Sequence, residues 1–566
     1  MRRRTRRPRN RSAPSTATPG RTEMTSVLER DRMPIEKTRK RSSPGKAALL
    51  VPAAYIAVAA FGVWWIDIRP AALVAGFGDL ANLVKRMVPP TTGDTGSLLA
   101  LALETLWIAI AGTGLAAIVS VALAAAASRR FVGPRAVQLA ARAIIVVTRS
   151  VPSLVFAIIF VRIFGLGPLA GVIAIALHSV GMIGKMMADV FEEQEQAPHD
   201  AVAAVGASRA QNFVATTLSR ALPAATSLVL YRLDINIRAS AVLGLVGAGG
   251  IGVALQTAIG SLNYQRAAGI ICVIVVMLLV LEAVSYAAQR AVAEHADVGT
   301  EAQLYAIRSD RAKLGWNRGR IMRTVGALVA AVLFLASLSQ LSFSPDRVLR
   351  AWDTALALMA GFVPPVFTGS VFVGIFESVI MAITATTAGV IFGLVIAVLS
   401  TRHLIRFEPL SLLLRGAIVL MRGVPDIIYA LVFVAALGLG PFAGFLALSI
   451  SCTALAAKFF TDSLAKVDPA PLRALEATGA NRLQVFVSGV WPQFVPAFIS
   501  NSLFTSDLAL RESAVLGIVG AGGIGFLLDE SVATLDYQVT AGIIIGLIVV
   551  VVALESTARW ARKRVI

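Results

Sequence analysis

The sequence predicts an all-α polytopic membrane protein built from two parallel repeats of about six transmembrane helices each, about 12 in total. Of its 566 residues, 57% are hydrophobic and 15% are charged, whereas about a quarter are charged in soluble domains. Many apolar segments are long enough to cross about 30 Å of hydrocarbon, which takes roughly 20 helical residues. Finally, residues 238–252 read RASAVLGLVGAGGIG, and residues 511–525, 273 positions later, read RESAVLGIVGAGGIG, an internal repeat.

The duplication keeps one register over most of both copies. Residues 149–152 read RSVP and residues 422–425 read RGVP, and GLGP occurs twice at the same offset. A constant offset means that both copies have the same order of elements and face the same way across the membrane. We therefore divide the folded part of the chain into a first repeat at 47–288, a cytoplasmic linker at 289–322 and a second repeat at 323–566.

The first 46 residues are strongly basic. They hold 15 Lys or Arg and 4 acidic residues, a net charge of +11 (15 − 4) out of +19 for the whole chain. Few large apolar residues occur in this segment, so it cannot bury enough surface to fold. We predict a disordered basic cytoplasmic tail at 1–46 that sets the orientation in the membrane. Binding to anionic lipid or nucleic acid is the alternative, and no nucleic-acid partner is expected.

Six apolar segments in each half are long enough to span a membrane. They lie near 47–66, 98–127, 136–164, 166–187, 221–247 and 267–288, and near 323–342, 371–399, 410–437, 440–461, 494–520 and 539–558. With the basic tail inside, the Arg-rich connections also fall inside, as the positive-inside rule requires. We expect a multi-pass protein of the bacterial cytoplasmic membrane, in contact with membrane lipid, with both termini cytoplasmic.

The longest connection inside each repeat, near 188–220 and 461–493, is cytoplasmic in this topology. Its apolar residues follow helical spacing on either side of a glycine, Gly206 or Gly479, which predicts two short amphipathic helices in each copy. The pattern Gly-Ala-x-Arg begins at both glycines. Its retention in a loop indicates that each copy docks onto a partner, and two equivalent surfaces imply two equivalent partners.

These connections resemble the loop by which permeases of ATP-binding-cassette importers contact their ATPase subunits. In that loop a Gly follows an Ala-rich segment and a Pro comes thirteen residues later, as with Gly479 and Pro492. The first copy has Ser219 at the Pro position, and neither copy begins with the family's Glu. The resemblance assigns these residues to ATPase coupling: Asp200, Gly206, Ala207, Arg209, Pro223, Arg473, Gly479, Ala480, Arg482, Pro492 and Pro496.

Further motifs narrow the resemblance to one importer type. RSVP, GLGP, GMIGK ending at Lys185 and the glycine-rich segment occur in an order that resembles the membrane subunit of phosphonate-type importers. The match covers about 104–282 and 377–555. Such subunits usually assemble as dimers, so the chain resembles two permeases fused in tandem, and the resemblance implies the importer permease fold.

The resemblance also implies a mechanism and a set of partners. It implies inward transport of a phosphonate or related small oxyanion by alternating access, two cytoplasmic ATPase subunits and an extracytoplasmic solute-binding protein. The sequence has no G-x-x-x-x-G-K followed by Ser or Thr, so ATP hydrolysis is expected on another chain. We therefore expect no enzyme activity and no cofactor or metal in this chain. The alternatives are import of phosphite, phosphate or an amino acid, and an ion-coupled secondary transporter.

The glycine-rich segment also satisfies the dinucleotide-binding pattern G-x-G-x-x-G. It ends a membrane-length apolar segment, however, and does not open a soluble strand-to-helix unit. We predict a tight turn at the outer membrane surface, where glycines permit unusual backbone angles and close helix approach. The turn residues are Gly247, Gly249, Gly250 and Gly252, with Gly520, Gly522, Gly523 and Gly525 in the second copy.

Arginines within apolar segments are candidates for the translocation path, because ionisable groups there normally face a bundle interior or an aqueous path. Asp234 and Arg238 are one helical turn apart and can pair, so a structural ion pair is as acceptable as path lining. Arg149 and Arg422 have no obvious local partner, which favours path lining for them. The candidate path residues are Arg149, Pro152, Asp234, Arg238, Arg422, Pro425, Asp507 and Arg511.

Overall fold

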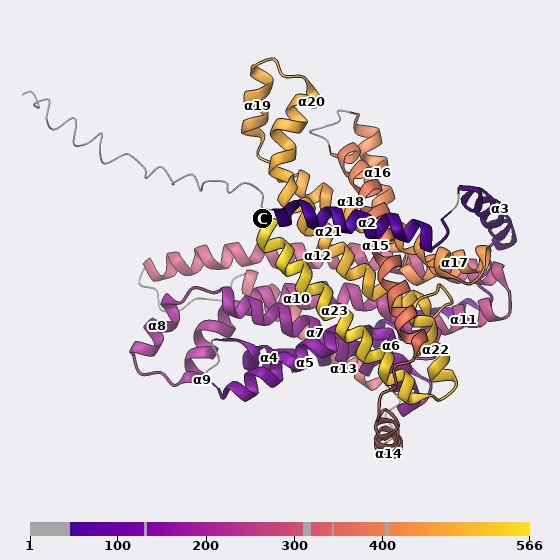
Figure 1. Ribbon diagram of the computed structural model, residues 1–566. Helices are drawn as coiled ribbons and strands as arrows, with labels where there is room; N and C mark the ends of the chain where they lie inside the picture. Colours follow the sequence, from indigo (N-terminus) through magenta and orange to yellow (C-terminus); the bar gives the residue numbers. More distant parts are fainter. Residues whose placement is uncertain are drawn as a thin grey trace, which may run out of the picture.

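The computed structural model describes residues 46–68, 70–129, 133–308, 318–341, 345–401 and 407–565. Every regular element in these ranges is a helix (Figure 1), which confirms the predicted fold class. The predicted basic tail lies outside the described residues except for Lys46, where the first helix begins.

The two halves contain equivalent helices in the same order. The first half contains α2 (Lys46–Trp65), α3 (Pro70–Met87), α4 (Thr95–Ala127), α5 (Arg135–Ser150), α6 (Ser153–Phe164), α7 (Pro168–Glu193), α8 (Ala197–Ala204), α9 (Arg209–Asn212), the π-helical turn η1 (Phe213–Leu218), α10 (Ser219–Leu243), the 3₁₀ turn η2 (Gly244–Val246), α11 (Ile251–Gly260) and α12 (Tyr264–Arg308). The second half contains α13 (Arg318–Ser339), α14 (Pro345–Gly361), α15 (Gly369–Ser400), α16 (Glu408–Gly423), α17 (Asp426–Leu437), α18 (Pro441–Leu464), α19 (Pro469–Ala477), α20 (Arg482–Val485), the π-helical turn η3 (Phe486–Val490), α21 (Trp491–Gly517), α22 (Ile524–Ala533) and α23 (Tyr537–Val565). Helices α2 to α12 thus recur as α13 to α23.

A proline bends one helix pair in each half. Pro152 separates α5 from α6 and Pro425 separates α16 from α17. The axes of the two pairs change direction by 94° and 83°. Proline has no N–H to donate and disfavours helical backbone in the residue before it. The spans predicted at 136–164 and 410–437 are therefore broken helices.

Eight described helices are long and apolar enough to cross a membrane, and ten spans result if each bent pair counts as one. Five of the six segments predicted in each half correspond to these candidates. The remaining predicted segment of each half, 47–66 or 323–342, corresponds to α2 or α13. The apolar described parts of these helices, Ala53–Trp65 and Thr324–Ser339, are shorter than a span requires.

Small residues bring the central helices of each half together. α4 packs along α7, and α15 packs along α18. A Cβ added at Gly112 of α4 would lie 2.7 Å from Ile175 of α7, and one at Gly393 of α15 would lie 2.8 Å from Ala456 of α18. Glycines at such crossings let helices approach closely inside a membrane. Each half therefore has a tightly packed central pair of its own.

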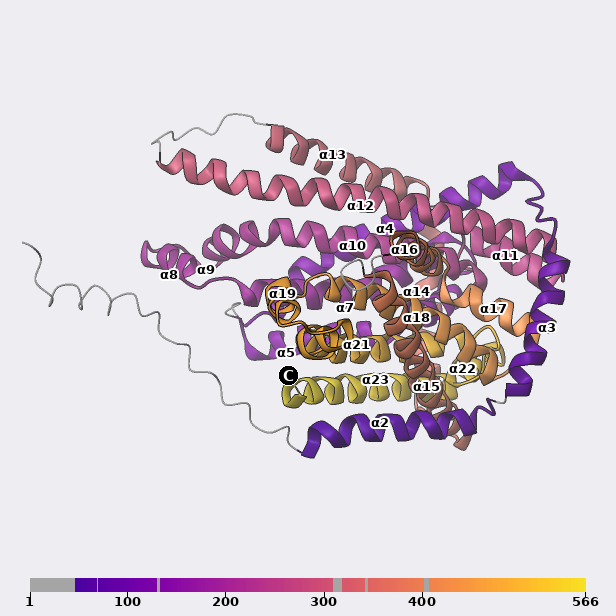
Figure 2. The ribbon, with the colours of Figure 1, turned by 90° about the horizontal axis from the view of Figure 1, so that it is seen from above.

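The two halves hold each other through reciprocal contacts. Helix α3 of the first half lies against α17 of the second, and α14 of the second lies against α6 of the first. In the same way α5 contacts α23, and α16 contacts α12. Figure 2 shows α3 at the right edge beside α17. The interface is thus built twice from equivalent elements.

The predicted linker is partly helical. Helix α12 continues without a break past the predicted boundary at 288 and ends at Arg308, and α13 begins at Arg318. Residues 309–317 lie outside the described ranges. Figure 2 shows α12 and α13 side by side, which agrees with their contacts. The division of the chain at 288/289 and at 322/323 stays a prediction.

Candidate functional site

The two predicted coupling segments have the same backbone design. In the first half α8 ends before Gly206, whose φ is +81°, and in the second α19 ends before Gly479, whose φ is +80°. The next short helix begins in each case with a capping box, formed by Ser208 and Gln211 in the first half and by Asn481 and Gln484 in the second. Left-handed φ favours glycine because it lacks a Cβ. The matched glycines therefore have a conformational reason for being glycine.

Both coupling segments are exposed. α8 and α19 have no buried residue, and a Cβ added at Gly206 or Gly479 would meet nothing within 4 Å. Val214 and Val487, matched positions in the π-helical turns, are each 55% exposed. The α8–α9 and α19–α20 segments lie apart from each other in Figure 1. Each half thus presents its own open surface.

The remaining predicted coupling residues lie in or next to these segments. Asp200 is in the first turn of α8, and Arg473 lies within α19. Pro223 and Pro496 are inside α10 and α21, just after a π-helical turn. Because proline lacks an N–H, it leaves a carbonyl of the preceding turn without its helical donor, and π-turns are common where a helix is interrupted.

The predicted glycine turns are tight, as expected. Gly247, Gly249 and Gly250 have φ of +84°, +85° and +77°, and Gly520, Gly522 and Gly523 have φ of +88°, +76° and +73°. Each turn holds the GLGP loop of its own half: the N–H of Gly167 donates to the oxygen of Gly247 at 3.0 Å, and the N–H of Gly440 donates to that of Gly520 at 2.9 Å. The turns lie on the side of α11 and α22, away from the coupling segments (Figure 2).

Gly252 and Gly525 meet the second expectation, close helix approach. A Cβ at Gly252 would lie 2.5 Å from the oxygen of Ala241, and one at Gly525 would overlap the oxygen of Ala514. The N–H of Ile251 donates to Thr105 of α4 at 2.8 Å. The turn therefore packs against α4, and its place at the outer membrane surface stays a prediction.

The bend arginines have partners that the sequence did not reveal. Arg149, at the end of α5, forms an ion pair with Glu555 of α23, and Arg422, at the end of α16, forms one with Glu282 of α12 at 3.2 Å. Each pair joins one half to the other. Neither arginine has a local partner, as the sequence indicates, but each is paired with a carboxylate of the other repeat. The lack of a local partner therefore no longer favours path lining, and that role stays a prediction.

The pairs predicted one turn apart are present. Arg238 lies 3.3 Å from Asp234, and Arg511 lies 2.6 Å from Asp507. Arg238 also lies 3.3 Å from Glu282, so Glu282 joins Arg238 to Arg422. Several charged atoms of this network are buried without a hydrogen-bond partner, namely Nε of Arg149, Arg238 and Arg511, Oε2 of Glu282 and Oδ1 of Asp507. The Arg149–Glu555 and Arg422–Glu282 pairs therefore link the halves, while the Asp234–Arg238 and Asp507–Arg511 pairs lie within one helix each.

Sequence reasoning missed a second set of polar residues. Arg232 of α10 is 5% exposed, and its Nε donates to Ser179 of α7 at 3.2 Å. In the second half Ser451 donates to Asp426, which follows the bend proline directly. None of these residues belongs to a matched motif. The only sequence signal for them is a mismatch between the copies, since Thr505 aligns with Arg232 and Ser153 with Asp426.

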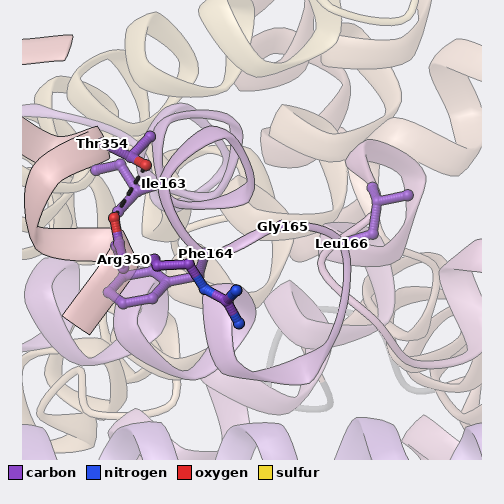
Figure 3. A pocket seen from close by; sticks show the side chains of 7 residues that line it. Ile163, Phe164, Gly165, Leu166, Arg350 and Thr354 are labelled. Carbon is purple, nitrogen blue, oxygen red and sulfur yellow. Dashed lines mark hydrogen bonds between the residues drawn. The ribbon is translucent and has the colours of Figure 1, made fainter. Parts of the chain in front are cut away.

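A cavity of about 400 Å³ lies where the halves meet on the side of the glycine turns. Figure 3 shows Phe164, Gly165 and Leu166 at the end of α6, with Arg350 and Thr354 from α14 of the second half. The hydroxyl of Thr354 donates to the backbone oxygen of Arg350 at 3.1 Å. The cavity is thus lined by both repeats and contains one basic side chain.

A duplicated bundle of membrane helices, with matched exposed segments on one side and an ion-pair network between its halves, defines the membrane domain of a transporter. A family model described as a binding-protein-dependent transport system inner membrane component matches residues 118–297 and again 389–566. The chain belongs to this family and carries its domain twice. It is a permease, the transmembrane subunit of an ATP-binding-cassette importer.

Curated relatives share this assignment. The phosphate-import permease protein PhnE of Mycolicibacterium smegmatis is 38% identical over 512 residues, which is 89% of this chain and 92% of the relative. The phosphite transport system permease protein PtxC of Stutzerimonas stutzeri is 37% identical over 39% of this chain and 81% of its own length. A putative cryptic phosphonate transport system permease protein of Escherichia coli is 36% identical over 21% of this chain and 99% of its own length.

Proposed function

We propose that this chain supplies both transmembrane halves of an importer for phosphonate, phosphate or phosphite, all small phosphorus oxyanions. The observation that carries the substrate class is the similarity to a phosphate-import permease over 92% of that protein's length. Arginines near the interface between the halves fit this class, because a guanidinium matches the geometry of a phosphate group. Import of an amino acid is the alternative within the same architecture.

Two cytoplasmic ATPase subunits drive the importer in this proposal. The α8–α9 and α19–α20 segments support it, because both are exposed, have the same design and leave space at their left-handed glycines. Closure of the ATPase pair would bring the two segments together and rock the halves about their interface. The reciprocal ion pairs of Arg149 and Arg422 lie between the moving halves.

The orientation belongs to the same proposal. The coupling segments, the C-terminus and the α12 end near the linker lie toward the same side in Figure 2, whereas α11 and α22 lie toward the other. We place the first side in the cytoplasm, with both termini there, and let a solute-binding protein deliver substrate to the side of the glycine turns. Reporter fusions at residue 300 and at the C-terminus should both read cytoplasmic, and an external signal at either would reject this topology.

Uptake by cells tests the function. A strain that needs this chain for growth on one phosphorus source is compared with its deletion mutant, using labelled phosphate, phosphite, methylphosphonate and an amino acid. We expect saturable uptake of one or more phosphorus oxyanions that is lost in the deletion mutant. Uptake that survives inactivation of the partner ATPase would favour an ion-coupled transporter, and amino-acid uptake alone would reject the substrate class.

A further inference from the structure

A buried arginine distinguishes the interior of the first half from that of the second. Arg232 lies within the candidate span Arg209–Val246 and is 5% exposed. Its counterpart, Thr505, is a neutral residue with 0% exposure. An ionisable group at the centre of a membrane helix costs about 2.5–3.5 kcal/mol on insertion scales and is normally functional. The first half therefore has a buried charged side chain at a position where the same fold in the second half has a neutral one.

A directed chain of hydrogen bonds fixes the inner edge of the Arg232 side chain. Nε of Arg232 donates to the hydroxyl of Ser179 at 3.2 Å, and that hydroxyl donates to Oδ1 of Asn236 at 3.0 Å. Nδ2 of Asn236 then donates to the hydroxyl of Thr113 at 2.8 Å. Because Ser179, Asn236 and Thr113 are all at most 2% exposed, this chain positions the guanidinium against α7.

The second half does not contain this chain. Cys452 stands at the position of Ser179, and Ala509 stands at that of Asn236. A thiol is a weak donor and a methyl group is none, so neither can hold a guanidinium in the same way. The support for Arg232 differs between the halves together with Arg232 itself, which indicates a specialised site and not an isolated substitution.

The two Nη atoms of Arg232 have no partner among the described residues. They make no hydrogen bond to a described residue, and no described carboxylate forms an ion pair with Arg232 within 4.0 Å. The two Nη donors are therefore available to a ligand that accepts hydrogen bonds.

A second arginine approaches the same place from the other half. Arg511 of α21 is 7% exposed, and its Nη1 lies 3.9 Å from the sulfur of Met182 on α7. Met182 and Ser179 are three residues apart and so lie on the same face of α7. Arg232 and Arg511 thus approach one face of α7, and of the two only Arg511 is paired with a described carboxylate, Asp507 at 2.6 Å. Glu512 interacts electrostatically with both arginines but forms no ion pair within 4.0 Å.

We infer that Arg232 and Arg511 form an oxyanion-binding subsite between the halves, with Arg232 as the ligand-binding residue peculiar to the first half. A tetrahedral oxyanion accepts hydrogen bonds from planar guanidinium groups and supplies the negative charge that buried Arg232 lacks among the described residues. Ser179 positions Arg232. The identity of the oxyanion as a phosphorus compound rests on the proposed function; the presence of the subsite does not.

Binding to the purified chain tests the subsite directly. The chain in lipid nanodiscs is titrated with inorganic phosphate and methylphosphonate, and binding is followed by broadening of the phosphorus NMR line. Loss of a charge-assisted hydrogen bond should raise the dissociation constant at least about tenfold in Arg232→Gln. Arg232→Lys should keep part of the affinity, and the matched control Thr505→Val should keep all of it. No broadening in the wild type, or equal broadening in Arg232→Gln, would overturn the inference.

Transport separates this inference from the proposed function. In the intact importer we expect Arg232→Gln to raise the KM for uptake at least about tenfold, with a smaller rise in Ser179→Ala. If Arg232 only balances the charge of Glu512, the double variant Arg232→Gln with Glu512→Gln should restore uptake, and restoration would overturn the inference. If the chain binds phosphate through Arg232 but imports no phosphorus oxyanion, the proposed function is rejected and the subsite is still supported.

Discussion

The two halves of this permease share a frame, meaning their helix order, glycine turns and helix breaks, and differ in their buried polar residues. The glycine turns and the capped coupling helices occur twice with nearly the same geometry, and the ion pairs of Arg149 and Arg422 join matched residues of the two halves. The polar interiors do not repeat. Arg232 corresponds to Thr505, and the hydrogen-bond chain behind Arg232 has no counterpart in the second half.

The bend regions show the same division. After Pro425 the second half has Asp426, which accepts a hydrogen bond from Ser451. At the position of Ser451 the first half has His178, whose Nδ1 lies 2.8 Å from the oxygen of Val151. The backbone break is common to both halves, while the polar group that occupies it differs. Two subunits of a homodimer must carry identical residues, whereas fused copies can diverge wherever the frame does not constrain them.

The shared frame gives the largest expected effect. Gly252→Leu and Gly525→Leu should both prevent formation of the folded protein, because the new Cβ would meet a backbone oxygen that cannot move away. Overpacking a core costs about 1–3 kcal/mol when side chains can adjust, and more when they cannot. Gly260→Leu is the matched control, since a Cβ there meets nothing within 4 Å. Size-exclusion profiles of the solubilised variants provide the measurement.

If Gly525→Leu folds and Gly252→Leu does not, the two glycine turns are not under the same steric constraint. That result would mean that the second glycine turn has relaxed, although the backbone angles of the two turns agree. Equal loss in both variants would establish that the two turns are under the same steric constraint.

The coupling segments give the next largest effect. Gly206→Leu and Gly479→Leu should each reduce ATP-driven uptake at least about tenfold, because left-handed φ costs a leucine roughly 1–2 kcal/mol and its side chain fills the space left for a partner. The protein should remain inserted. Gly479→Asn is the control, because asparagine tolerates left-handed φ. Undiminished uptake in both leucine variants would reject the docking assignment, and unequal losses would show unequal coupling.

The sequence predicts the frame well, for a physical reason. Repeated glycines and prolines indicate backbone angles and helix breaks that few other residues satisfy. The pattern therefore predicts the tight turns at Gly247 and Gly520 and the helix break at Gly206. The sequence places Pro152 and Pro425 inside predicted spans but does not indicate how sharply the helices bend there. The size of the bends depends on packing against α7 and α18, which local sequence does not specify.

The ion pairs between the halves could not be predicted in the same way. Arg149 and Glu555 are 406 residues apart, and a search for partners within one helical turn cannot find them. Glu282 and Glu555 are matched positions of the two repeats, but a match between copies does not show which arginine each contacts. Arg232 escaped notice because a search for repeats favours matched residues, and Arg232 is informative because it is unmatched.

The ion pairs should produce a smaller effect than the glycines. Glu555→Gln leaves Arg149, whose side chain is 15% exposed, without a described carboxylate within 4.0 Å. Removing one partner of a fully buried pair costs about 3–5 kcal/mol, so about 1–3 kcal/mol is expected at this exposure. Glu282→Gln should cost a similar amount, because Arg238 keeps Asp234 while Arg422 loses its partner. Thermal unfolding of the purified variants measures both.

The double variant Arg149→Gln with Glu555→Gln separates pairing from path lining. If the pair only joins the halves, removing both charges should recover most of the stability and uptake lost in Glu555→Gln. If Arg149 contacts the substrate, stability should recover and uptake should not. The same test on Arg422 and Glu282 shows whether the two halves agree on this point.

The smallest effect is expected where the coupling segments differ. The N–H of Ser219 donates to the oxygen of Val214 in the π-helical turn, so Ser219→Pro should cost about 1 kcal/mol for one lost hydrogen bond. Pro492→Ser supplies a donor near the start of α21, where proline is tolerated without an N–H, and should change stability by only a few tenths of a kcal/mol. Both variants should keep uptake within about twofold, because neither side chain borders the open space at the coupling glycines. A large loss of uptake in Ser219→Pro with normal stability would show that transport requires a change in the π-helical turn of the first segment. The second segment already has a proline at this position and could not change in the same way.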